Sequence, residues 1–277
     1  MSKRVGLAVI ATVALSLAGS SGASAGVTFT WDPGNVGLGT NPNSFTANNI
    51  VVSDFANIAV NNNTGDFNET GVLIFQGFQN GGFGILAPGF TNVTGGSGYG
   101  FYVTFTASGN QGGGIPPVGG SVTGIISSLN YTLYGSVNGA IGITTLSNND
   151  PTPTNNTGAI QLATGSLVGV GTTTLTNSTT GGLSPKADVL VSMTAAAGAS
   201  SFFVAPPASA LDLLLGDFSV TSSITTVADP SLANTTDLII TGGGGNLLAT
   251  VPEPASILVF SSGLVMLGFL GARRRAA

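Results

Sequence analysis

The sequence predicts an all-β body, arranged as an antiparallel β-sandwich or a jelly roll. Two observations point to this fold class: segments in which apolar and polar residues alternate, and stretches rich in Gly, Asn and Pro between them. Val27–Trp31 alternates strictly and is followed by the turn signal Asp32-Pro33-Gly34. Similar segments, rich in Val, Ile, Thr, Phe and Tyr, follow at 50–60, 72–78, 100–107, 121–134, 160–175, 187–194, 218–226 and 238–241. Many short strands between turns are typical of packed antiparallel sheets.

Two segments of the body do not read as strands. Pro207–Leu215 is the one helical candidate, about two turns long. Gly242–Thr250 contains four consecutive glycines, and it is interpreted either as a flexible spacer or as a plain surface loop. We therefore assign 26–241 to the β-rich extracellular body and 242–250 to a Gly-rich spacer.

The N-terminal segment 1–25 has the three parts of a secretory signal peptide. Lys3 and Arg4 precede an apolar run of 14 residues, and the small residues that follow end in Ala23-Ser24-Ala25. The run is shorter than the ~20 apolar residues that a transmembrane helix needs. We expect cleavage between Ala25 and Gly26, with an uncleaved membrane anchor as the alternative.

Nearly all basic residues lie in the two terminal segments, whereas nearly all acidic residues lie in the body between them. Residues 26–250 contain ten acidic residues and a single basic residue, Lys186, which gives a net charge of −9. Such a body cannot neutralise many phosphates, so nucleic acid is excluded as a partner. A polybasic contact with anionic lipid is excluded for the same reason.

The residue types that carry most enzymatic chemistry are missing from the sequence. It has no cysteine and no histidine, so thiol nucleophiles, thiolate metal sites and His-based triads are excluded. A Ser–Lys pair could use only Lys186, and the Ser-x-x-Lys spacing fails because position 183 is Leu183. We predict no catalytic residues, no cofactor and no enzymatic activity.

Two alternatives that use carboxylates stay open. A pair of acids could support glycoside hydrolysis, with Trp31 as the only tryptophan for a sugar platform and core packing as its simpler role. The segment 61–69 collects amide and carboxylate oxygens in a loop, which calcium prefers. It departs from an EF-hand loop, so an Asn-rich turn is the favoured interpretation and no metal site is predicted. The candidate acids are Asp32, Asp54, Asp66, Glu69, Asp150, Asp188, Asp212, Asp217, Asp229 and Asp237.

The C-terminal segment 251–277 combines three features. Val251-Pro252-Glu253-Pro254 is followed by the uncharged apolar segment 255–272 and then by Arg273, Arg274 and Arg275. As a helix, its 18 residues reach ~27 Å, close to the ~30 Å thickness of a hydrocarbon core. The arginines would remain on the cytoplasmic side. This topology places the body outside, as the N-terminal signal does.

This tail resembles the PEP-CTERM sorting signal of Gram-negative bacteria. The resemblance rests on the order of the motif, the span and the arginine cluster at the end of the chain, and it covers about a tenth of the sequence. It implies recognition by an exosortase, a multi-pass membrane enzyme that cuts at or near Pro252-Glu253-Pro254. It also implies that 255–272 is a transient anchor and that Arg273–Arg275 act as a stop signal. An anchor that nothing cuts is the alternative.

These features predict an exported, non-enzymatic protein of the cell surface or extracellular matrix, associated with exopolysaccharide or biofilm. Before processing, it would be held in the membrane by its C-terminal span. A carbohydrate-binding or adhesive module is the alternative, and a two-carboxylate glycoside hydrolase is a further one. The binding module would need exposed aromatic residues on one sheet face, for which the candidates are Tyr99, Tyr102, Tyr131 and Tyr134.

Overall fold

The computed structural model describes residues 27–39, 43–91, 98–145, 150–180, 182–219, 224–228 and 234–250. The predicted signal peptide, its cleavage residues Ala23, Ala25 and Gly26, and the sorting tail at 251–277 lie outside the described residues. Within the described part of the chain, no helix is long and apolar enough to cross a membrane.

The described chain is all-β with antiparallel pairing in its large sheet, which confirms the predicted class. In this part of the chain eight long strands pair side by side. Their order is β11 (Gly171–Ser178), β12 (Gly182–Ser192), β15 (Asp212–Ser219), β17 (Thr235–Thr250), β3 (Asn49–Asn61), β4 (Asp66–Asn80), β6 (Gly100–Asn110) and β7 (Ser121–Ser136).

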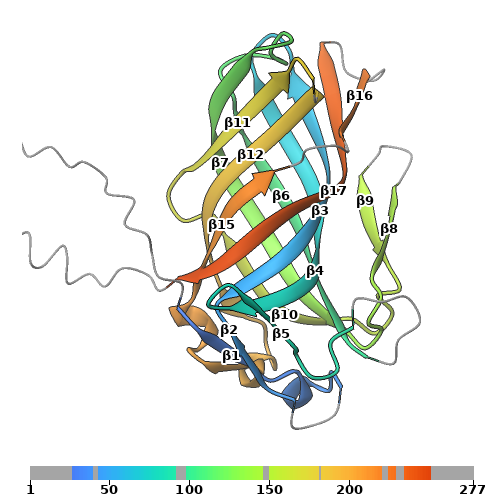
Figure 1. Cartoon of the computed structure of the whole chain (residues 1–277), viewed down its shortest axis with the longest axis vertical. Helices are drawn as coiled ribbons and strands as arrows, with labels where there is room; N and C mark the ends of the chain where they lie inside the picture. Colours follow the sequence, from blue (N-terminus) through green and yellow to red (C-terminus); the bar gives the residue numbers. More distant parts are fainter. Residues whose placement is uncertain are drawn as a thin grey trace, which may run out of the picture.

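The sheet closes on itself because β7 pairs with strands on both of its sides. One side of β7 pairs with β6, and the first half of its other side pairs with β11, at the opposite end of the strand order. The second half of that side pairs with β10 (Ile160–Ser166). Opposite walls of the closed sheet therefore face each other across a shared interior, as the two sheets of a sandwich do (Figure 1).

Smaller elements surround this closed sheet. β14 (Phe203–Ala205), β1 (Phe29–Trp31) and β2 (Phe45–Ala47) form a three-stranded sheet near one end (Figure 1). β8 (Gly142–Thr145) and β9 (Pro151–Thr154) form a separate hairpin, while β5 (Phe83–Ile85) pairs with β4, β16 (Ile224–Ala228) with β17, and β13 (Thr194–Ala195) with β10. Short 3-10 helices cover Pro33–Val36, Ser200–Phe202 and Ala208–Ala210.

An aromatic cluster fills the end of the interior that lies beside the small sheet. Trp31 has no exposed surface, and its ring centroid lies 4.5 Å from that of Phe29 and 5.0 Å from that of Phe202. Phe75 and Phe101 join it from β4 and β6, with centroids at 6.5 and 6.0 Å. Alternation along each strand sends these rings inward. The expectation that Trp31 packs in the core is confirmed.

Two expectations about local structure are wrong. Pro207–Leu215 is not a two-turn helix: a 3-10 turn at Ala208–Ala210 leads directly into β15. Leu213, Leu214 and Leu215 pair with β12 and β17, so sheet packing overrides their helical propensity. Gly242–Thr250 is not a spacer, since it forms the second half of β17 and pairs with β3 and β15. The body therefore extends to Thr250.

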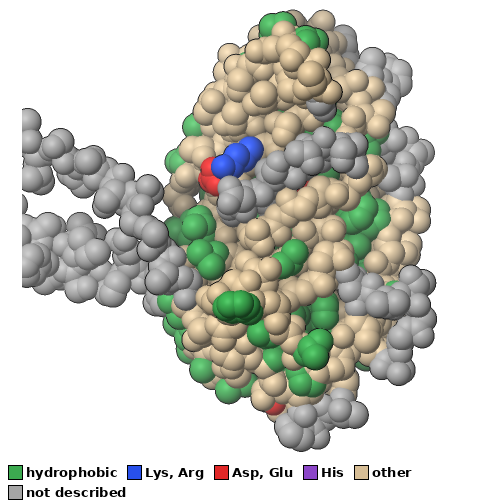
Figure 2. Space-filling model, in the orientation of Figure 1, with side chains coloured by type: hydrophobic (Ala, Val, Ile, Leu, Met, Phe, Trp, Pro, Cys, Tyr) green, Lys and Arg blue, Asp and Glu red, His purple; other side chains and the backbone are tan. Residues whose placement is uncertain are grey.

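The two ends of the described body lie together. The backbone N–H of Val27 donates to the carbonyl oxygen of Ala249 at 2.9 Å, and Thr250 pairs with Asp212. The face shown in Figure 2 carries few charged side chains, as the composition predicts.

Candidate functional site

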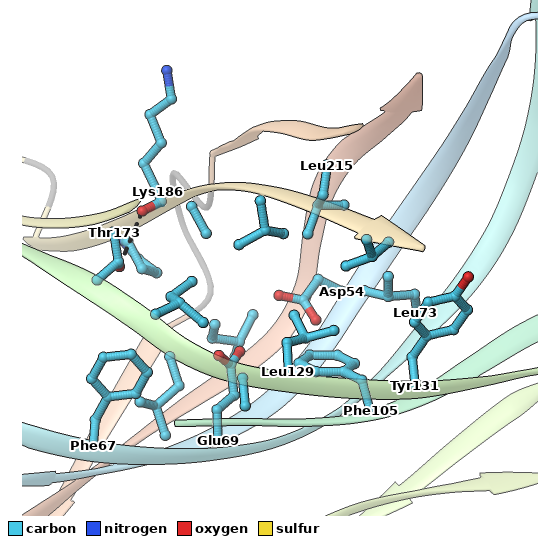
Figure 3. A pocket seen from close by; sticks show the side chains of 18 of the residues that line it. Asp54, Phe67, Glu69, Leu73, Phe105, Leu129, Tyr131, Thr173, Lys186 and Leu215 are labelled. Atoms are coloured by element: carbon cyan, nitrogen blue, oxygen red, sulfur yellow. Dashed lines mark hydrogen bonds between the residues drawn. The ribbon is translucent and has the colours of Figure 1, made fainter. Parts of the chain in front are cut away.

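A cavity of about 100 Å³ lies between the inward-facing side chains of the closed sheet. Its walls are mostly aliphatic and aromatic side chains that point inward from the strands (Figure 3). Phe67 and Leu73 come from β4, Phe105 from β6, Leu129 from β7 and Leu215 from β15. Two carboxyl groups, those of Asp54 and Glu69, stand among these apolar side chains.

Asp54 occupies an inward position in the middle of β3. Its side chain is only 4% exposed, and its Oδ1 atom has no hydrogen-bond partner. Its cross-strand partner on β17 is Gly243, so the position directly opposite it on that strand has no side chain. Burial raises the pKa of Asp54 well above its ordinary value, and the negative charge of Glu69 raises it further.

Glu69 faces the same interior from β4. It pairs across the sheet with Ile58 on β3 and with Ala107 on β6, and all three residues line the cavity. Its side chain is partly buried, and desolvation raises its pKa to about 7. Both acids thus favour their neutral form more than an exposed carboxyl does, and their mutual repulsion opposes ionisation of both together.

The other ionisable groups that line the cavity do not neutralise this pair. The Tyr131 hydroxyl donates to the carbonyl oxygen of Ser192 at 2.9 Å, and burial, with a smaller effect of the Asp212 charge, raises its pKa. The Lys186 side chain extends away from the cavity in Figure 3, and its carbonyl oxygen accepts from Thr173 Oγ1 at 3.2 Å. Among the cavity-lining residues that the structure describes, no cation points at the two acids.

The candidate tyrosines do not form an exposed platform. Tyr99, Tyr102 and Tyr131 are buried, and Tyr134 is half-buried. Tyr102 and Tyr134 stack with centroids 5.0 Å apart and an interplanar angle of 14°, in a cluster that also holds Ile141. These side chains therefore stabilise the packing of the sheet and its covering loops.

The segment 61–69 does not converge on a metal. Asn61 Oδ1 accepts from the backbone N–H groups of Asn63 and Thr64, which makes an Asn-rich turn. The exposed carboxylate of Asp66 accepts hydrogen bonds from Thr64 Oγ1 at 2.8 Å and from Asn110 Nδ2 at 2.6 Å. Glu69, in contrast, lines the cavity in the interior of the sheet. Within the described ranges, no three metal-ligating side chains of the His, Cys, Asp and Glu types lie together.

The structure thus brings together two of the ten candidate acids in one cavity, Asp54 and Glu69. The sorting residues Pro252, Glu253 and Pro254 and the arginines 273–275 lie outside the described residues. Comparisons of the chain with protein-family models, with curated proteins and with solved structures find no significant match.

Proposed function

We propose that the chain is an exported, non-enzymatic protein of the cell surface or extracellular matrix, sorted through its C-terminal tail by an exosortase-type membrane enzyme. The sequence of the two ends carries this proposal: a signal peptide with a cleavage site before Gly26, and a tail that combines Pro252-Glu253-Pro254, an apolar span and three arginines.

The geometry of the body supports it through one observation, the contact between its two ends. Val27 is hydrogen-bonded to Ala249, so the segments that precede and follow the body attach at the same place. A body attached at one place can stand outside the membrane during both export and sorting. Because β17 runs to Thr250, only Val251 separates the folded sheet from Pro252. A sorting enzyme would therefore act directly beside the folded body.

The surface and the interior favour a structural role over catalysis. Charged side chains are rare on the face in Figure 2, which suits a body that lies among neutral polysaccharide chains. The acid pair Asp54 and Glu69 lies in a cavity of about 100 Å³ inside the closed sheet. A polysaccharide does not fit such a cavity, so we do not assign glycoside hydrolysis to this pair. Burial of Tyr99, Tyr102 and Tyr131 removes three of the four tyrosines that were candidates for a sugar-binding platform.

The proposal is tested by following the protein between cell envelope and medium in a producing bacterium that has the sorting enzyme. Three forms are compared: the full chain, a chain that lacks 251–277, and Glu253→Gln with Pro252→Ala and Pro254→Ala. We expect the full chain to pass through the envelope and lose its tail, the truncated chain to bypass the envelope, and the motif variant to stay in the membrane with its tail. Identical fractionation and tail length for the full chain and the motif variant would refute recognition of the motif.

A further inference from the structure

The proposed export and sorting make no use of the acid pair inside the closed sheet. A buried carboxyl oxygen without a hydrogen-bond donor is costly, because it has lost water and gained no partner. Asp54 Oδ1 is such an atom, on a side chain that is 4% exposed and that lines the cavity. A hydrogen-bond donor brought into the cavity would satisfy this atom.

We propose that the cavity binds a small apolar amine in its protonated form. The ammonium group would donate to Asp54 and Glu69, and the hydrocarbon part would lie among Leu73, Leu129 and Leu215 (Figure 3). Charge-assisted hydrogen bonds of this kind are the stronger ones in a water-poor interior. This inference concerns the body alone and does not depend on the proposed sorting of the tail.

The choice of an amine follows from the groups that line the cavity. Calcium would need six to eight oxygen ligands, whereas the described lining of the cavity offers two carboxyl groups among largely apolar side chains. A fatty acid would bring a further negative charge against the pair. An alcohol would supply one hydrogen-bond donor but no positive charge. It would therefore not offset the electrostatic cost of ionising Asp54 and Glu69 next to each other.

The size of the cavity limits the ligand. A cavity of roughly 150 Å³ accepts benzene, and this one measures about 100 Å³. An amine of about four to six non-hydrogen atoms is therefore the right probe class. n-Butylamine, protonated at pH 8, serves as the probe in the experiment below.

Binding of the amine is expected to depend on pH because protons compete for the same oxygens. The ionisable groups that line the cavity are Asp54, Glu69, Tyr131 and Lys186. Tyr131 stays protonated over the range used, and the Lys186 side chain extends away from the cavity. The pair therefore sets the pH dependence, and affinity for butylammonium should rise from pH 5 to pH 8.

The test is a thermal unfolding titration of the full chain with butylammonium chloride, with ammonium chloride and 1-butanol as ligand controls. We expect the melting temperature of the wild type to rise with butylammonium at pH 8, and much less at pH 5. Asp54→Asn with Glu69→Gln should lower the affinity at least about tenfold, as expected for loss of charge-assisted hydrogen bonds. Ala107→Leu keeps both acids but places three more carbon atoms opposite Glu69, and it should also lose binding.

Three outcomes would overturn the inference. The first is no shift of the wild-type melting temperature at pH 8 with butylammonium beyond that with ammonium. The second is an equal shift in the variant with both acids neutralised. The third is an equal effect of 1-butanol, which would reduce the site to an apolar void. If a variant does not fold, the comparison of butylammonium with ammonium and 1-butanol on the wild type still decides.

Discussion

Replacement of Glu69 by glutamine should make the body more stable at neutral and alkaline pH. Glutamine has the shape of the protonated side chain but cannot ionise. The pKa of Glu69 rises from 4.5 to about 7 in the folded protein, and a tenfold change in proton affinity corresponds to about 1.4 kcal/mol. The buried charge of Glu69 therefore lowers the free energy of unfolding by about 3 kcal/mol above pH 7.

The direction of the pH dependence follows from proton linkage. Between the unfolded pKa of Glu69 and its folded value of about 7, the folded state binds more protons than the unfolded state. Stability therefore falls as pH rises through this window and levels off above it. Below pH 4.5 both states are protonated and Glu69→Gln should have little effect. Asp54 and Asp212 have raised pKa values and act in the same direction, whereas the lowered pKa of Asp66 acts at more acidic pH.

The assay is thermal or urea unfolding of wild type and Glu69→Gln from pH 4 to pH 9. The difference between the two curves isolates Glu69, together with its repulsion of Asp54. For a body of this size, about 3 kcal/mol corresponds to a melting temperature about 6–12 °C higher for the variant at pH 8. Parallel pH curves for the two proteins, or a wild type whose stability rises from pH 5 to pH 8 relative to the variant, would refute the buried position of this charge.

Two further variants test the packing around the site. Gly71→Ala should destabilise the body by about 1–3 kcal/mol in urea unfolding, because the new Cβ would lie 2.2 Å from Cζ of Phe105; Gly77→Ala on the same strand meets nothing within 4 Å and is the matched control. Equal losses for these two glycine variants would contradict the packing of Phe105 over Gly71. Trp31→Ala should cost about 3–5 kcal/mol, since Trp31 is 0% exposed; a loss below about 1 kcal/mol would contradict its place at the centre of the aromatic cluster.

Much of the strand content could be predicted because alternation and turn residues are local signals. The predicted segments 50–60, 100–107 and 121–134 fall within β3, β6 and β7. The single segment 160–175 is split into β10 and β11 by a turn in which Gly169 has a φ of +76°. The closure of the sheet was not predictable in this way, since the pairing of β7 with β11 depends on contacts between distant parts of the chain.

The Gly-rich end of the body was misread for a physical reason. Composition describes the flexibility of an isolated segment, and glycine has the greatest freedom there. In the folded sheet, however, Gly244 pairs with Ser53 on β3 and with Ser219 on β15, and Gly243 pairs with Asp54 on β3. Tertiary hydrogen bonding thus decides the structure. The same holds for Leu213–Leu215, where packing between β12 and β17 outweighs helical propensity.

The buried position of Asp54, one of the two cavity acids, could be inferred from the sequence. Asp54 interrupts the inward-facing apolar series Ile50, Val52, Ala56 and Ile58, and an acid at such a position signals a buried carboxyl group. Glu69 was hidden because the turn at 61–65 made the whole segment look like a loop, although Phe67, Glu69 and Leu73 share one face of β4. The meeting of the two acids depends on the pairing of β3 with β4, which no local pattern reveals.

Intact mass spectrometry of protein recovered from a producing culture tests the central claim most directly, because one measurement reads both ends of the chain. We predict a mature protein that begins at Gly26 and ends at or near Pro252–Pro254, with Arg273, Arg274 and Arg275 removed. A mass that still includes Met1, or one that retains Arg275, would contradict export with sorting at the C-terminal tail.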